Sequence, residues 1–176
     1  AHDPFFAGNV DALIAAQPKD LEASEIEVRL GATWLDKKYI EQFMYETFET
    51  PRYLRGQIEI SYVPYTAEWQ VSRKSMVRYN DVAAFTTYGT DRASAYRLLE
   101  DALNLRDIRI YDTIEDADGR ERRVLNAKET TLAAQKQQLI RDAFKDWIWK
   151  DPERRETLVR QYNEEMNSTR PRLSLI

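Results

Sequence analysis

Residues 129–149, ETTLAAQKQQLIRDAFKDWIW, carry an apolar stripe on one side and polar groups on the other. The apolar residues recur at steps of three and four, at Leu132, Leu139, Ile140, Ala143, Phe144, Trp147 and Ile148. The opposite face holds Lys136, Gln137, Arg141, Asp142 and Lys145. This period predicts an amphipathic helix, about 30 Å long at roughly 1.5 Å per residue. Its stripe needs one continuous partner surface, which the predicted upstream strands would supply.

Helix signals also occur near the start of the chain. Residues 9–17 are predicted to form a short helix that ends at Pro18. Asp36 is the expected N-cap of a second helix, which runs until Pro51. Its stripe comprises Ile40, Phe43, Met44, Thr47 and Phe48, and Trp34 with Leu35 lie where a hydrophobic staple would pin its start.

Residues 21–30 support two interpretations. The alternation of Ile26, Val28 and Leu30 indicates a strand. A capping box of Ser24 and Glu27, followed by Gly31, indicates a helix, and we favour the helix.

Period-two alternation predicts two antiparallel hairpins and one further strand. The first hairpin joins residues 57–62 to residues 69–71 through a turn at 64–67. The second has Asp118-Gly119 as its turn, between a strand containing Ile108, Ile110 and Ile114 and a return through residues 122–125. Residues 82–88 are rich in β-branched and aromatic side chains, which predicts the further strand.

Two more helices complete the predicted architecture. One follows Gly89, is capped by Thr90 or Asp91 and stops at Asn104, with a stripe of Ala95, Leu98, Leu99, Ala102 and Leu103. The last begins at Asp151-Pro152, with a stripe of Leu158, Val159, Tyr162 and Met166, before a linker at 167–176. The expected fold is α+β: antiparallel hairpins and an additional strand packed against amphipathic helices, with a helical C-terminal part. We expect a single domain over residues 1–172, followed by a tail at 173–176.

Composition excludes several classes of function. The 176 residues include no cysteine and one histidine, His2, so disulfides, thiolate metal sites and histidine-based triads are not expected. No apolar run approaches the roughly 20 residues that span a bilayer, so we expect a cytoplasmic protein without a membrane partner. The formal net charge of −4 is not that of a generally basic nucleic-acid binder, although local basic patches can still bind.

The sequence contains no catalytic or cofactor-binding motif. Neither a GxxxxGK[ST] loop nor GxGxxG occurs, so no nucleotide cofactor is expected. The acidic residues between 112 and 118 miss the spacing of a calcium loop, and the acidic pairs Glu115-Asp116 and Glu164-Glu165 are better explained as solvated charge. We therefore expect no catalytic, cofactor or metal site.

Basic residues gather in three places. Arg73, Lys74 and Arg78 follow the first hairpin and are flanked by Trp69 and Tyr79, a mixture of cations and rings that suits nucleic-acid single strands or phosphate backbones. Further groups are Arg120, Arg122 and Arg123 on the second hairpin, and Lys150, Arg154 and Arg155 between the last helices. Charged hairpins also protect edge strands from aggregation, which is the alternative explanation. The candidate DNA-binding residues are Trp69, Arg73, Lys74, Arg78, Tyr79, Arg120, Arg122 and Arg123.

Several stretches resemble one segment of large mobile-element proteins that fuse an adenine-specific DNA methylase to a Swi/Snf-type helicase. These stretches are QPKDLEASEIEVRLGATW (17–34), YIEQFMYE (39–46), TTYGT (86–90), LNLRDIRIYD (103–112), KETTL (128–132) and NSTRPR (167–172). In that family the segment lies between the methylase and the helicase motor, whose ATP-binding loop begins after the position of Arg172. Residues 173–176 depart from the family pattern.

The resemblance implies that the parent protein is a DNA methylase fused to a helicase, and it assigns no catalytic residue to this chain. Neither the methylase Asn/Asp-Pro-Pro-aromatic tetrapeptide nor the helicase Asp-Glu box is present. We therefore expect a non-catalytic accessory domain that positions the motor or contacts DNA, with other domains of the parent chain as partners. The alternative is a structural spacer or protein-interaction domain that does not bind DNA, and an independent enzymatic activity is a third, weaker possibility.

Overall fold

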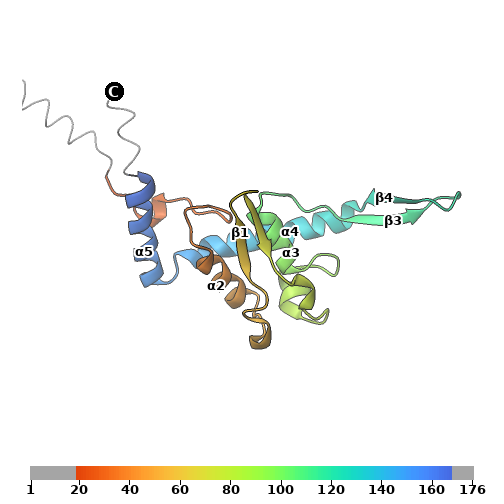
Figure 1. Ribbon diagram of the computed structural model, residues 1–176, viewed down its shortest axis with the longest axis horizontal. Coiled ribbons are helices and arrows are strands. Elements are labelled where there is room, and N and C mark those ends of the chain that lie inside the picture. Colours follow the sequence, from red (N-terminus) through yellow and green to blue (C-terminus); the bar gives the residue numbers. More distant parts are fainter. Residues whose placement is uncertain (1–18, 168–176) are drawn as a thin grey trace, which may run out of the picture. The chain divides into compact units, whose positions relative to one another are not determined.

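The structure, a computed structural model, describes residues 19–167 (Figure 1). The helix predicted at 9–17 and most of the linker predicted at 167–176 lie outside this range. The chain divides into two compact units. The main unit comprises residues 28–148, and the terminal unit combines residues 1–27 with 149–176.

The main unit has an α+β fold, as the sequence predicts. Its helices are α2 (Lys37–Thr47), α3 (Ala95–Leu103) and α4 (Ala127–Ile148). Strands β1 (Ile60–Val63) and β2 (Glu68–Val71) form one antiparallel hairpin, with Ile60 opposite Val71. Strands β3 (Tyr111–Glu115) and β4 (Glu121–Leu125) form a second, separate hairpin with Tyr111 opposite Leu125. Both predicted hairpins are therefore confirmed.

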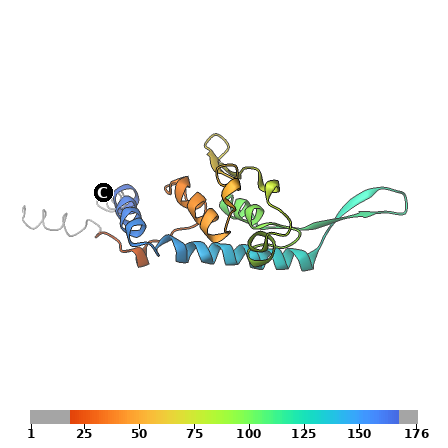
Figure 2. The same ribbon diagram turned by 90° about the horizontal axis from the view of Figure 1, so that it is seen from below.

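Helix α4 is the long element on which the main unit is assembled, and α2 and α3 pack on the same side of it (Figure 2). Its buried residues are Ala133, Gln137, Ile140, Phe144 and Ile148. The predicted faces were partly wrong, because Gln137 is buried while Leu132 and Leu139 are 42% and 44% exposed. The Gln137 Nε2 donates to the backbone carbonyls of Leu98 (3.3 Å) and Arg106 (3.1 Å), so the buried amide nitrogen has hydrogen-bond partners.

Side chains from the helices close the edges of the β1–β2 hairpin. The Glu41 carboxylate accepts from the Ile60 N–H at 3.0 Å, and the Glu100 carboxylate accepts from the Val71 N–H at 2.8 Å. Asn104 pairs with the backbone of Trp69 through its Oδ1 (2.7 Å) and Nδ2 (2.8 Å). Because these contacts satisfy edge groups that another strand would otherwise pair, the two-stranded sheet is complete without a third strand.

The strand predicted at residues 82–88 is wrong, since Ala83–Thr87 form a π-helical turn. The Asp81 carboxylate accepts from the Ala84 N–H at 3.0 Å and starts this turn. Gly89 then passes so close to the chain that an added Cβ would lie 2.0 Å from the Ala84 carbonyl oxygen. Close packing of small residues here overrides the local β propensity.

Two helix predictions also need correction. Residues 21–30 form only a 3-10 turn at Ala23–Glu25 and then run extended, with the side chains of Ile26, Val28 and Leu30 buried in alternation. Helix α3 is capped by Ser94 and not by Thr90 or Asp91. The Thr90 hydroxyl instead accepts from the Ala93 N–H at 3.0 Å within the preceding turn. The predicted stop at Asn104 and the Asp36 cap of α2 are confirmed.

The terminal unit contains α5 (Pro152–Tyr162), which begins at Asp151-Pro152 as predicted, and a π-helical turn at Asn163–Asn167. Asp151 is the N-cap of α5. The Asn163 side chain bonds both backbone groups of Leu21, at 2.8 and 3.0 Å, and so ties residues 19–25 to the end of α5. Between residues 19 and 167, no helix combines the length and apolar character needed to cross a membrane.

Candidate nucleic-acid interface

Trp69 is a packing residue of the first hairpin. Its side chain is only 5% exposed, and its ring centroid lies 4.8 Å from that of Tyr62. Both of its backbone groups bond Asn104. A base could reach the indole ring only if this part of the core opened, so Trp69 does not belong to an accessible site.

Lys74 is already neutralised by an acid. Its Nζ lies 2.6 Å from the Glu100 Oε2 and also donates to the Val71 carbonyl at 3.3 Å. The Glu100 side chain is 18% exposed, so water screens this pair incompletely. The ion pair fastens the root of the β1–β2 hairpin to α3 and leaves little charge for a phosphate.

Arg73 remains exposed and lies where the chain turns after β2. Its φ of 51° is in the left-handed region. Its guanidinium donates to the Gln57 Oε1 at 3.3 Å, and the Gln57 Nε2 donates to the Tyr53 carbonyl at 3.1 Å. Arg73 is thereby connected to the 3-10 turn Arg52–Leu54 that precedes β1.

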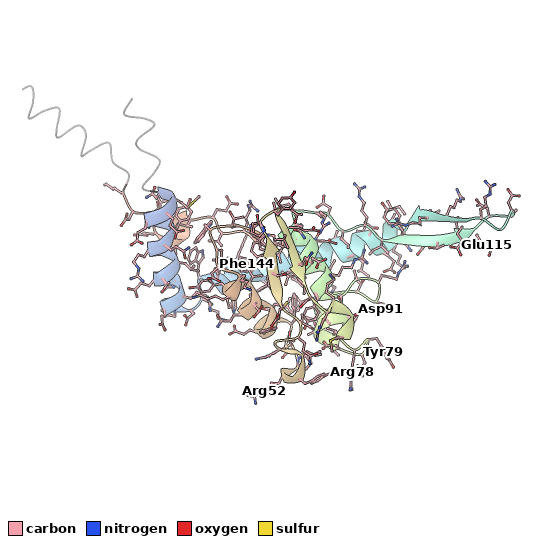
Figure 3. All side chains as sticks on the ribbon, in the orientation of Figure 1. Arg52, Arg78, Tyr79, Asp91, Glu115 and Phe144 are labelled. Carbon is pink, nitrogen blue, oxygen red and sulfur yellow. The ribbon has the colours of Figure 1, made fainter. Side chains whose placement is uncertain are left out.

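Arg78 and Tyr79 are both exposed. The Tyr79 side chain is 89% exposed, and Arg78 has no ion-pair partner within the described part of the chain. Val77, directly before them, is buried and fixes the chain at this point. The Arg78 and Tyr79 side chains project from the same end of the main unit as Arg52 (Figure 3).

Arg52 and Tyr53, which are not among the residues predicted from the sequence, lie at the same end (Figure 3). Tyr53 is 59% exposed, whereas Leu54 beside it is 1% exposed and anchors the turn. The signal was available, because Arg52-Tyr53 is the same dipeptide as Arg78-Tyr79. We call these four residues together with Arg73 the Arg-Tyr end.

The two segments that build the Arg-Tyr end are locally basic. Residues 51–58 and 71–80 contain five Lys and Arg residues and no acid, although the chain as a whole is acidic. Two of these cations are already engaged. Arg55 donates to the Thr50 carbonyl at 2.9 Å and lies over the Tyr45 ring, and Lys74 pairs with Glu100. Arg52, Arg73 and Arg78 therefore carry the charge available to a polyanion.

The second predicted cluster lies apart from the first, on the β3–β4 hairpin that projects from the main unit (Figures 1 and 2). Arg122 pairs with Asp116 at 3.1 Å, and the Arg123 guanidinium lies 4.3 Å from the Tyr111 ring centroid. Residues 115–123 contain three arginines, Arg120 among them, against four acids. The net acidic hairpin is therefore a poorer match for DNA than the Arg-Tyr end.

The base of this hairpin is held firmly. Arg92 donates to the Asp112 carboxylate and to the Tyr111 carbonyl, both at 2.7 Å, and the Asn126 amide donates to Asp112 at 2.9 Å. The hydrogen bond from Arg92, helped by that from Asn126, holds the pKa of Asp112 below its usual value. Apolar side chains of both strands are exposed, and Ile114, Val124 and Leu125 are 37%, 39% and 49% accessible.

The third predicted basic group, Lys150, Arg154 and Arg155, lies in the terminal unit. Among them, Arg155 donates to the Trp149 carbonyl at 3.2 Å. Residues of α5 and of the segment 19–25 also line an open groove of about 970 Å³ with mixed charge. Over residues 19–167, no group of three His, Cys, Asp or Glu side chains is arranged to hold a metal ion.

Comparison with known proteins gives one match. Residues 29–168 match the family described as Domain of unknown function (DUF8437). No curated protein and no solved structure matches the chain. Since the match covers most of the sequence, including both hairpins and α2 to α5, the chain belongs to the DUF8437 family.

Proposed function

We propose that this chain is a non-catalytic accessory domain that contacts DNA through its Arg-Tyr end, within a larger protein of the methylase/helicase type that it resembles. The observation that carries the proposal is the concentration of cations in residues 51–58 and 71–80, which contain five Lys and Arg residues and no acid, with Glu59 and Asp81 as the acids that directly follow them. Arg52 and Arg78 point outward there without an ion-pair partner among the residues described. Such arginines gain free energy by releasing the counterions of a phosphate backbone.

Three available cations limit the strength of this contact. Non-specific DNA binding typically has a Kd of roughly 10⁻⁴ to 10⁻⁶ M at physiological salt, and a small site belongs at the weak end. Sequence preference, ATP hydrolysis and methyl transfer are assigned to other domains of the parent chain. The purified chain is expected to show no DNA-stimulated ATPase activity above that of a mock purification.

The β3–β4 hairpin supports a second role, docking onto another protein domain. Its apolar residues Ile114, Val124 and Leu125 are exposed, and its acids outnumber its arginines. β3 and β4 pair only with each other among the described strands, and an isolated two-stranded ribbon is marginally stable in water. Contact with a neighbouring domain of the parent chain would cover this surface, which corresponds to the spacer or protein-interaction alternative.

A matched pair of variants separates the two surfaces. One variant carries Arg52→Ala, Arg73→Ala and Arg78→Ala. The other removes the same number of positive charges from the β3–β4 hairpin, by changing Arg120, Arg122 and Arg123 to alanine. With fluorescent DNA at low salt, the first variant should lose at least about tenfold in affinity and the second about twofold or less. A larger loss in the hairpin variant would move the contact to β3–β4. If the wild type does not bind, the domain acts as a spacer.

A further inference from the structure

We infer that the DNA bound at the Arg-Tyr end is single-stranded, with unpaired bases stacking on Tyr53 and Tyr79. This inference rests on the proposed function and names its substrate class. Tyr79 is 89% exposed and Tyr53 59% exposed, and each directly follows an exposed arginine. A guanidinium beside a free aromatic face is the combination that binds a phosphate and its adjoining base together.

These two rings differ from the aromatic rings that pack against one another in the main unit. Tyr62, Tyr88 and Tyr96 all contact other rings, at centroid distances of 4.8 to 5.6 Å. Within residues 19–167, neither Tyr53 nor Tyr79 has such a contact. Their faces are open to a ligand, and the packing of the main unit does not account for their presence at the surface.

The backbone beside each ring is fixed. The Leu54 N–H bonds the Pro51 carbonyl at 2.9 Å, and the Leu54 side chain is buried. The Asp81 N–H bonds the Arg78 carbonyl at 3.0 Å, so Tyr79 lies inside a closed turn. Both rings are thus presented from anchored turns, which lowers the entropy lost on binding.

A single strand fits this surface better than a duplex. In a duplex the bases are already stacked and paired, so a tyrosine ring gains contact only after the step is opened, at a cost of a few kcal/mol. Three available arginines cannot neutralise many phosphates, whereas stacking adds affinity at any base. A protein ligand would also suit exposed tyrosines and arginines, but the absence of acids in residues 51–58 and 71–80 favours a polyanion.

The test compares three labelled probes on the complete chain: an oligothymidylate of about 20 nucleotides, an abasic strand of the same length, and a duplex. The wild type should bind oligothymidylate at least about tenfold more tightly than the other two probes. Tyr53→Leu with Tyr79→Leu should remove this difference and leave the abasic affinity unchanged, since stacking is worth roughly 5- to 150-fold per base.

Tyr65→Leu is the matched control, because Tyr65 is 97% exposed in the turn between β1 and β2, away from the Arg-Tyr end. It should bind all three probes as the wild type does, and circular dichroism confirms that each variant is folded. Equal wild-type affinity for all three probes would overturn the inference and leave the arginine-based proposal intact. A wild type that binds none of them would overturn both and point to a protein partner.

Discussion

Phe144→Ala is expected to destabilise the main unit by about 4 kcal/mol. The Phe144 side chain is fully buried, and its ring lies 5.2 Å from that of Phe43 at 80° and 6.4 Å from that of Trp147 at 24°. Burial of an aromatic side chain removes at least about 150 Å² from water, which at roughly 25 cal/mol per Å² gives about 4 kcal/mol. The lost edge-to-face contact with Phe43 adds to this value, and partial collapse of the cavity reduces it.

Leu139→Ala is the matched control on the same helix. Leu139 is 44% exposed, so its truncation should cost less than about 1 kcal/mol. In urea denaturation followed by circular dichroism, a slope of about 2 kcal/mol per M would place the Phe144→Ala midpoint about 2 M below the wild type. The Leu139→Ala midpoint should fall by less than about 0.5 M. An unchanged Phe144→Ala midpoint would mean that Phe144 is not part of the packed face of α4. Equal shifts would mean that the face bearing Leu132 and Leu139 is packed as well.

Three further perturbations test individual contacts. Gln137→Ala removes the donor to one buried and one partly buried carbonyl and should cost about 1 to 3 kcal/mol in the same urea assay. Burial raises the pKa of Tyr96 to about 12. The Tyr96 hydroxyl therefore ionises at a lower pH in the unfolded chain than in the folded one, and the free energy of unfolding should fall as pH rises from about 10 to 12. Tyr96→Phe should reduce this loss. Arg92→Ala should raise the pKa of Asp112, measured by NMR titration. Because the folded pKa of Asp112 is lowered, the stability difference between Arg92→Ala and wild type should be present at neutral pH and disappear as pH falls through that pKa.

Local signals in the sequence predicted those elements that are stabilised by neighbours in the chain. The Asp36 and Asp151 side chains accept from backbone N–H groups two and three residues ahead, and Gly119 supplies the positive φ of its turn. Each depends on a few adjacent residues, so a single sequence suffices. The α+β class and both hairpins followed from such signals together with period-two alternation.

Tertiary partners decided the features that the sequence did not reveal. Gln137 lies on the buried side of α4 because carbonyls of Leu98 and Arg106 face it there, which periodicity cannot predict. Residues 82–88 form a helical turn because Asp81 and Gly89 constrain both of its ends. In each case the deciding contact overrides a local preference.

In the candidate site, too, local signals predicted some residues and tertiary contacts decided the others. Adjacent cations and rings identified Arg78 and Tyr79, and the same criterion applied to residues 52–53 would have found the other half of the Arg-Tyr end. Burial of Trp69 and neutralisation of Lys74 by Glu100 depend on packing against α3 and β1. For Trp69 and Lys74, the sequence therefore predicts a ring and a charge that the folded chain does not offer to DNA.

The most direct test of DNA binding at the Arg-Tyr end is the salt dependence of the affinity for a single strand. With three available arginines, the slope of log K against log salt should be about −2 for the wild type. Removal of Arg52, Arg73 and Arg78 should bring that slope close to zero, whereas removal of Arg120, Arg122 and Arg123 should leave it unchanged. A slope that survives the first set of substitutions and disappears with the second would show that the contact lies on the β3–β4 hairpin and not on the Arg-Tyr end.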